Sequence, residues 1–159
     1  MHRSGFGWLV CVMLLLVGCA SAPPLPPPVR GSAAADLAAK RFENRPGVAR
    51  VYVYRNTRHG QEFLMALKLD DVELGTLGSY AFMPLELPAG FHRLSARNEE
   101  ASSLELNLQA GRSYFVQLNT VLGSMPAKPE LLEMHALEGQ YAIGNECVLV
   151  LPREYRLSE

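Results

Sequence analysis

From Val48 onward, apolar and polar residues alternate with a period of two along the chain. The clearest examples are residues 63–69, 104–108 and 114–118, in which every second side chain is a large apolar one. Successive side chains of a β-strand point to opposite faces, so this pattern predicts strands with one face buried. A chain built this way must pack the apolar faces of its strands against one another, which restricts residues 48–159 to a mainly β domain.

The strands are bounded by residues that favour turns, such as Gly60, Gly78, Gly90 and Gly111. The expected strands are residues 48–55, 63–70, 72–77, 80–87, 91–97, 103–109 and 113–120. The tail predicts a strand over 131–137, a helical turn over 138–143 and a last strand over 147–151, and residues 121–130 form the longest irregular stretch. Short strands at this spacing predict a single antiparallel β-sandwich of about seven to nine strands.

The order of several short motifs resembles a bacterial family of unknown function, DUF2846, whose members often occur on lipoproteins. The motifs are Val51-Tyr52-Val53-Tyr54-Arg55, Leu67-Lys68-Leu69-Asp70, Glu73-Leu74-Gly75, Tyr80, Leu87-Pro88-Ala89-Gly90-Phe91-His92 and Ala110-Gly111-Arg112-Ser113-Tyr114-Phe115. The resemblance implies a PEGA-type, prealbumin-like sandwich and supplies no activity. One departure is Asp71, where such hairpins usually carry glycine. Aspartate tolerates the left-handed conformation, so the hairpin is retained and its turn type is left open.

The N-terminus has the features of a secretory signal peptide. Arg3 precedes twelve residues, 6–17, that are apolar apart from Gly7. This run is too short for a transmembrane helix, which needs about 20 residues. A signal peptide over residues 1–18 is therefore expected.

The end of this apolar run resembles a lipobox, the motif that lipoprotein signal peptidase recognises. Leu16, Val17 and Gly18 precede Cys19, whereas Cys11 follows the bulky Val10 inside the apolar run. The resemblance implies cleavage before Cys19 and attachment of fatty acids such as palmitate to that residue. Two or more acyl chains would anchor the protein stably in a membrane. Ala20 rather than aspartate follows Cys19, which by analogy indicates the outer membrane, facing the periplasm. The alternative is an ordinary signal peptide that ends by chance at a cysteine.

Residues 19–47 are expected to form a tether. The run Pro23-Pro24-Leu25-Pro26-Pro27-Pro28 cannot lie inside a helix or sheet, so it predicts polyproline II. Residues 20–28 would then form a semi-rigid spacer of roughly 28 Å at about 3.1 Å per residue, or alternatively a proline-rich ligand for a partner. Residues 32–42 predict a short helix capped by Ser32, with Leu37 and Phe42 as apolar contacts.

Charge is distributed unevenly along the sequence. Residues 30–60 carry seven basic and two acidic side chains, and residues 61–159 carry seven basic and fourteen acidic ones. The basic segment is interpreted as a solvated positive face, with contact to anionic headgroups as the alternative, at about 1 kcal/mol per charge. The net charge of −1 gives no indication of a nucleic-acid partner.

The residues able to carry chemistry are few and scattered. The histidines after the signal segment are His59, His92 and His135, and their spacing predicts no metal site; no other cofactor or catalytic motif is predicted. His92 is expected to make local hydrogen bonds within its turn. Cys147 lies in an apolar strand and is expected to be a buried thiol, with an intermolecular disulfide as the alternative. Four tyrosines are expected to pack in the core rather than line a groove: Tyr52, Tyr54, Tyr80 and Tyr114. Since Val51 and Val53 alternate with two of them, the strand over residues 48–55 is expected to be covered on both faces.

These features predict a lipid-anchored envelope protein that acts as a binding or scaffold module and not as an enzyme. Its partners would be membrane lipid, through the acyl chains on Cys19, and an envelope protein that binds a loop or sheet edge. An envelope hydrolase with an unrecognised site is the alternative, and it requires a histidine that converges with acidic residues. A purely structural role in outer-membrane assembly cannot be separated from the first hypothesis by sequence.

Overall fold

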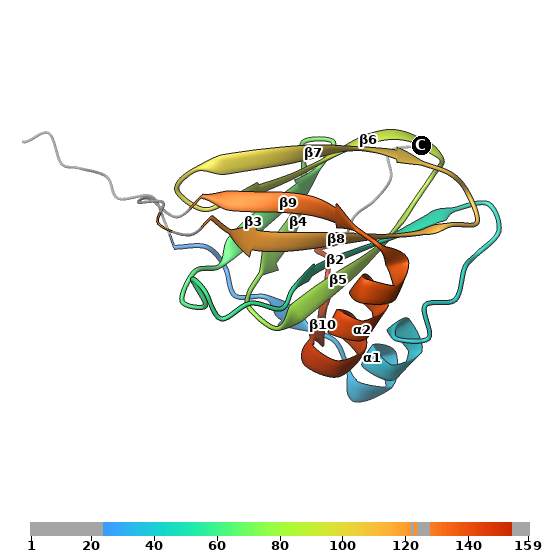
Figure 1. Ribbon diagram of the computed structural model, residues 1–159, viewed down its shortest axis with the longest axis horizontal. Helices are drawn as coiled ribbons and strands as arrows, with labels where there is room; N and C mark the ends of the chain where they lie inside the picture. Colours follow the sequence, from blue (N-terminus) through green and yellow to red (C-terminus); the bar gives the residue numbers. More distant parts are fainter. Residues whose placement is uncertain (1–23, 122, 124–127, 154–159) are drawn as a thin grey trace, which may run out of the picture.

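The computed structural model describes residues 24–121, 123 and 128–153, and it shows a mainly β domain with two helices (Figure 1). The strands are β1 (Val29–Arg30), β2 (Ala49–Arg55), β3 (Met65–Leu69), β4 (Val72–Leu77), β5 (Ala81–Leu87), β6 (Gly90–Arg97), β7 (Ala101–Leu108), β8 (Ser113–Thr120), β9 (Pro129–Met134) and β10 (Val148–Leu151). The helices are α1 (Ala33–Ala39) and α2 (Ala136–Glu146). The predicted mainly β class is confirmed, with ten strands in the described part of the chain.

The strands form two sheets that pack face to face. One sheet has the order β1-β10-β5-β2-β8-β9, and the other has the order β4-β3-β6-β7. The four-stranded sheet is antiparallel, as predicted, but the six-stranded sheet is mixed because β2 runs parallel to β8 and β10 runs parallel to β5. The chain leaves the six-stranded sheet after β5, builds β6 and β7 in the other sheet, and returns beside β2 in the same direction. The expectation of a fully antiparallel sandwich is therefore wrong for this sheet.

Both helices cover the outer face of the six-stranded sheet, which gives the molecule three layers (Figure 1). The first core lies between the sheets and contains Val51, Val53 and their neighbours. The second lies between the six-stranded sheet and the helices, and it contains Tyr52, Phe115 and Ile143. Strand β2 is buried along its whole length because it contributes to both cores, as the alternation of valine and tyrosine predicted.

Helix α1 belongs to the folded domain. Ser32 caps it as predicted, since its Oγ accepts a hydrogen bond from the Ala35 N–H at 3.2 Å. Asp36 accepts a hydrogen bond from the Leu149 N–H at 2.8 Å and thereby ties the helix to β10. Phe42 packs against the second core as expected, but Leu37 is 68% exposed and makes no such contact.

The tail differs from the prediction in the extent of its helix. Helix α2 has eleven residues where a single turn was expected, and His135 precedes the helix instead of lying in a strand. Gly139 allows the helix to approach β8 closely, because a Cβ atom at this position would lie 2.5 Å from the Phe115 side chain. The described part of the chain contains no helix long and apolar enough to cross a bilayer.

Candidate functional site

The described part of the predicted tether, residues 24–28, lies against the domain. The buried hydroxyl of Thr76 on β4 donates a hydrogen bond to the Pro26 carbonyl at 2.7 Å. Val29 and Arg30 then pair with β10 as strand β1. Prolines cannot donate backbone hydrogen bonds but their carbonyls can accept them, so this segment can dock through its oxygens. The predicted free spacer is therefore wrong for residues 24–28.

A cavity of about 580 Å³ lies where this segment meets the outer face of the four-stranded sheet. We call it the tether pocket and define it by its lining residues: Pro24, Leu25, Pro26, Ala66, Leu67, Lys68, Glu73, Gly75, Thr76, Ser95, Ala96, Arg97 and Arg153. Its volume falls in the range of small-ligand sites, about 300–1,000 Å³. No part of the sequence analysis pointed to this cavity.

Strand register explains why the sheet is hollow at this point. Ala66 on β3 lies between Thr76 on β4 and Arg97 on β6, and Lys68 lies between Glu73 and Ser95. Gly75 lies at an irregularity in the β3–β4 pairing, with a φ of 121° that side chains rarely adopt. Small residues therefore occupy the centre of the pocket, and long charged side chains stand around them.

The charged side chains of the pocket are mostly basic. Lys68 faces Glu73 at 3.8 Å, the most loosely held ion pair of this sheet. The Arg153 backbone N–H donates to the Leu74 carbonyl at 2.7 Å, which adds the C-terminal segment to the edge of β4. Within the described residues, the guanidinium groups of Arg97 and Arg153 have neither a hydrogen-bond nor an ion-pair partner. The pocket thus holds three cations and one carboxylate.

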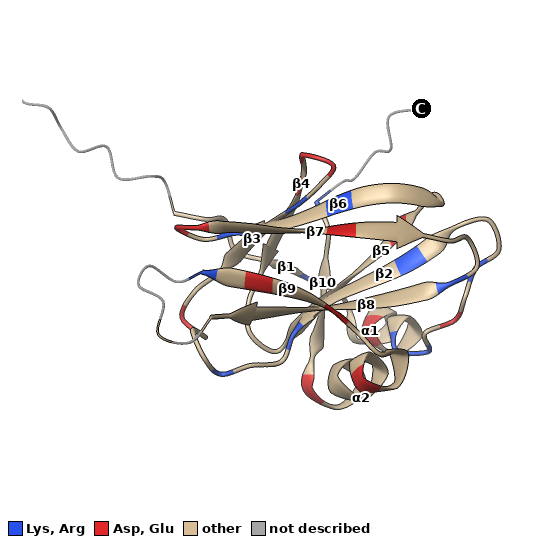
Figure 2. Ribbon diagram, turned by 45° about the horizontal axis from the view of Figure 1, so that its top comes forward, with Lys and Arg blue, Asp and Glu red and all other residues tan. Residues whose placement is uncertain are grey.

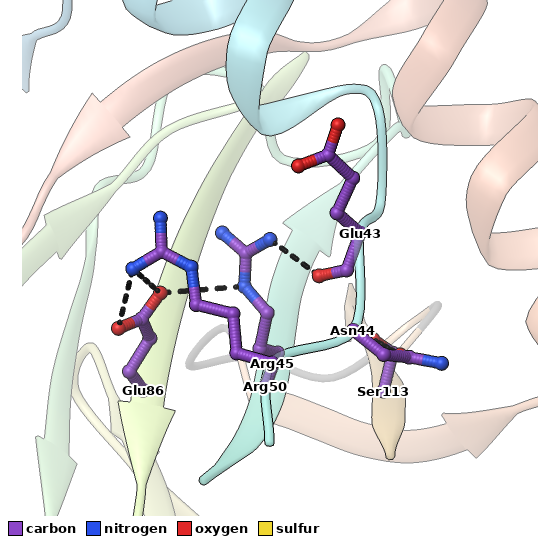
Figure 3. Close-up of polar contacts among 6 residues, drawn as sticks. All are labelled: Glu43, Asn44, Arg45, Arg50, Glu86 and Ser113. Carbon is purple, nitrogen blue, oxygen red and sulfur yellow. Dashed lines mark hydrogen bonds and ion pairs between the residues drawn. The ribbon is translucent and has the colours of Figure 1, made fainter. Parts of the chain in front are cut away.

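A second charged cluster joins the segment after α1 to the six-stranded sheet (Figure 3). Arg45 contacts both carboxylate oxygens of Glu86, at 3.0 and 3.2 Å, and Arg50 donates to the Glu43 carbonyl at 2.8 Å. Arg50 Nε lies 3.5 Å from Glu86, an ion pair without hydrogen-bond geometry. Ser113 donates to Asn44 at 2.7 Å. These contacts hold the chain to β2, β5 and β8, so the cluster serves the fold.

The basic segment of the sequence is solvated only in part. Arg41, Arg45 and Arg58 are exposed, as the solvated-face interpretation predicted, whereas Arg50 and Arg55 are buried. Arg55 is fully buried, and it donates to the carbonyls of Phe63, His59 and Gly60 and to the Thr120 hydroxyl. Burial lowers its pKa. Basic and acidic positions are interspersed over the molecule (Figure 2). The alternation that puts Val51 and Val53 in the core also places Arg55 there, so the burial of Arg55 could have been predicted from the sequence.

His92 makes the local hydrogen bonds that its turn motif predicted. Its Nδ1 lies 2.6 Å from Asp70 Oδ2 and its Nε2 lies 3.1 Å from the Pro88 carbonyl. Asp70 also accepts from the Arg93 N–H at 2.8 Å. Burial alone would raise the pKa of Asp70, but the hydrogen bonds from Arg93 and His92 outweigh it and lower the pKa. The ring thus joins the turn at Asp70 to the turn at Pro88.

The same network explains the departure at Asp71. Asp70 and Asp71 have φ values of 49° and 68°, and they link Leu69 to Val72 as a two-residue hairpin. Positive φ at both positions is the signature of a type I′ turn. Asp71 can replace glycine here because its carboxylate accepts a hydrogen bond from the Arg93 guanidinium at 2.7 Å, beside the contacts of Asp70 with His92 and Arg93.

The remaining predicted residues lie apart from one another. His59 lines a loop cavity with Glu130, whereas His135 is exposed at the start of α2. The described residues contain no group of three His, Cys, Asp or Glu side chains arranged to hold a metal. Tyr52 and Tyr54 are buried and Tyr114 packs against the first core, as predicted, whereas Tyr80 is half-buried and belongs to neither core. Cys147 is also buried, and burial raises the pKa of its thiol to about 12, which keeps it in the unreactive protonated form. Leu16, Val17, Gly18 and Cys19 lie outside the described residues.

The fold and the pocket define a class of protein: a mainly β domain of two packed sheets, with its N-terminal segment folded against one of them. Residues 45–129, more than half of the chain, match the family described as "Protein of unknown function (DUF2846)", and the chain belongs to this family. An uncharacterized protein of Haemophilus influenzae is 28% identical over 137 residues, which cover 85% of this chain and 78% of that protein. No solved structure gives a significant match. The likeness to PEGA-type repeats stays a prediction.

Proposed function

We propose that the protein is a lipid-anchored module of the bacterial envelope that binds a partner and does not catalyse a reaction. The observation that carries this proposal is the docking of residues 24–28 on the domain through Thr76 and β1. Only four residues separate Cys19 from Pro24. Fully extended, that stretch spans at most about 18 Å. A fatty acid on Cys19 would therefore hold the tether pocket close to the membrane surface.

The positions of the reactive side chains support the non-catalytic part of the proposal. The hydrolase alternative requires a histidine that converges with acidic residues. His92 does meet Asp70, at 2.6 Å, but its other ring nitrogen faces the Pro88 carbonyl, so the ring links two turns. We therefore regard the tether pocket as the better candidate for a functional site.

Metabolic labelling with a palmitate analogue, followed by mass spectrometry of the mature N-terminus, tests the anchor. We expect wild-type protein and the matched control Cys11→Ser to carry the label and to begin at Cys19. Cys19→Ala should lose the label, because the sulfur that carries the diacylglycerol is gone. A mature chain that begins elsewhere, or one without fatty acid, would contradict the proposal.

Crosslinking and affinity purification of the anchored protein test the binding part. The comparison is between wild type, Cys19→Ala and the pocket variant Arg97→Ala, with Arg93→Ala as a control on the same strand and face. We expect one component to be captured by wild type and Arg93→Ala and to be lost from the other two. Capture that is unaffected by either the anchor or the pocket would argue against this role.

A further inference from the structure

The tether pocket has the charge and shape of an anion site. Its rim carries Lys68, Arg97 and Arg153 against the single carboxylate of Glu73. These side chains come from three places: β3, β6 and the segment that follows β10. Lys68 and Arg97 are diagonal neighbours on adjacent strands, since Lys68 pairs with Ser95 and Arg97 pairs with Ala66. Diagonal neighbours lie roughly 7–8 Å apart, which leaves room for an ion between their long side chains.

Two of the three cations are free to bind a ligand. Within the described residues, Arg97 and Arg153 have no partner for their guanidinium groups, whereas Arg45, Arg50, Arg55 and Arg93 all have one. Lys68 is held only by Glu73, at 3.8 Å. Binding an anion here would therefore break at most one weak ion pair.

The centre of the pocket allows a ligand to reach the sheet. Ala66 and Gly75 supply no bulk, and Ser95 supplies a hydroxyl that can donate to an anion. The second open pocket of the same sheet differs, because its side chains His92 and Arg93 already contact Asp70 and Asp71. An anion is thus accommodated beside the tether and not beside His92.

We infer that the tether pocket binds a phosphate group through Arg97, Arg153 and Lys68. Guanidinium groups match the geometry of phosphate oxygens, and several donors around one group suit a tetrahedral ion. The position of the pocket favours the phosphate of an anionic lipid headgroup over free phosphate, and this part rests on the proposed anchoring at Cys19. The pocket would then hold the domain in one orientation on the membrane that carries it.

The test is titration of the full chain in neutral detergent, followed by calorimetry or by ³¹P line broadening. The two probes are inorganic phosphate and glycerophosphoglycerol, the water-soluble headgroup of phosphatidylglycerol. We expect wild type to bind the headgroup, and Arg97→Ala to bind it about tenfold or more weakly, because a charged hydrogen bond is lost. Arg97→Lys should lie between them. Arg93→Ala, on the same strand and face but outside the pocket, should match wild type.

The outcomes separate the sources of phosphate. Headgroup binding that depends on Arg97 supports the lipid assignment, and inorganic phosphate binding alone with the same dependence supports the pocket but assigns it to free phosphate. Binding of neither probe, or binding that Arg97→Ala leaves unchanged, overturns the inference. The Cys19→Ala chain retains every pocket residue and should bind as wild type does. A wild-type chain that carries no fatty acid would contradict the anchoring without affecting this result.

Discussion

The two outer faces of the sandwich differ in what covers them. The outer face of the six-stranded sheet carries Tyr52, Phe82 and Phe115 and lies beneath both helices, where Tyr52 and Phe115 stack with ring centroids 5.1 Å apart. The outer face of the four-stranded sheet is polar and open. It carries Arg93, Ser95 and Arg97, and among the described residues the segment from residue 24 and Arg153 lie against it.

This difference separates the face that stabilises the fold from the face that we propose for binding. An aromatic face contributes to stability when helices exclude water from it. Any polar group buried there must then form a hydrogen bond, or its burial lowers the stability of the fold. The Tyr52 hydroxyl is buried without a partner, and burial raises its pKa. An open face can keep unpaired charges because water solvates them. The unpaired guanidinium of Arg97 therefore carries little desolvation penalty, and it is available to a ligand.

The largest expected effect compares one residue type on the two faces. Phe115→Ala should lower the free energy of unfolding by about 3–5 kcal/mol, because it leaves a cavity under the helices. Phe91→Ala should change it by less than about 0.5 kcal/mol, since Phe91 is 82% exposed on the open face. Urea denaturation followed by circular dichroism measures both. Equal losses in the two variants would break the distinction between the faces.

A smaller effect is expected from two glycines of α2. Gly139→Ala should destabilise the fold by about 1–3 kcal/mol, because the new methyl group would overlap the Phe115 side chain. Gly144→Ala, in the same helix with open space around it, should instead stabilise by up to about 1 kcal/mol through helix propensity. Thermal melts of the two variants should shift in opposite directions. A neutral Gly139→Ala would mean that the helix does not press on the sheet at this point.

The smallest effect concerns the polar network of the open face. The folded-state pKa of Asp70 lies below its ordinary value, so its stabilisation is present above that ordinary value and is lost as the pH falls through the folded-state pKa. Asp70→Asn keeps a residue that tolerates positive φ but removes this titration. Because Asp70 is partly exposed, we expect the difference to stay below about 1 kcal/mol.

Denaturation curves from pH 7 down to pH 2 should therefore converge for wild type and Asp70→Asn as the pH falls, with wild type more stable only at the upper end. Curves that stay parallel across this range would show that the carboxylate charge does not support the turn.

Local chemistry allowed much of the secondary structure to be predicted. Strands β4 and β8 have the predicted bounds. Ser32 caps helix α1 and Asp70 lies in a turn, and both roles follow from local sequence. The full length of α2 was missed because a helix that packs on a sheet can form without a strong helical spacing of apolar residues. Strand β1 was missed because two residues are too few to show an alternation. The tether pocket was missed for a similar reason. Lys68, Arg97 and Arg153 are far apart in the chain, and no motif of the sequence contains more than one of them.

By itself, the sequence determined that the chain is mainly β, that β2 is buried on both faces and that the first residues resemble a lipoprotein signal, since each of these depends on neighbours along the chain. Tertiary structure alone decided which strands run parallel, that the terminal nitrogens of the buried Arg55 find oxygen acceptors, and that residues 24–28 fold back onto β4 beside the tether pocket. The reason is physical: these features depend on contacts between distant segments, and their energies exist only after the sheets have packed.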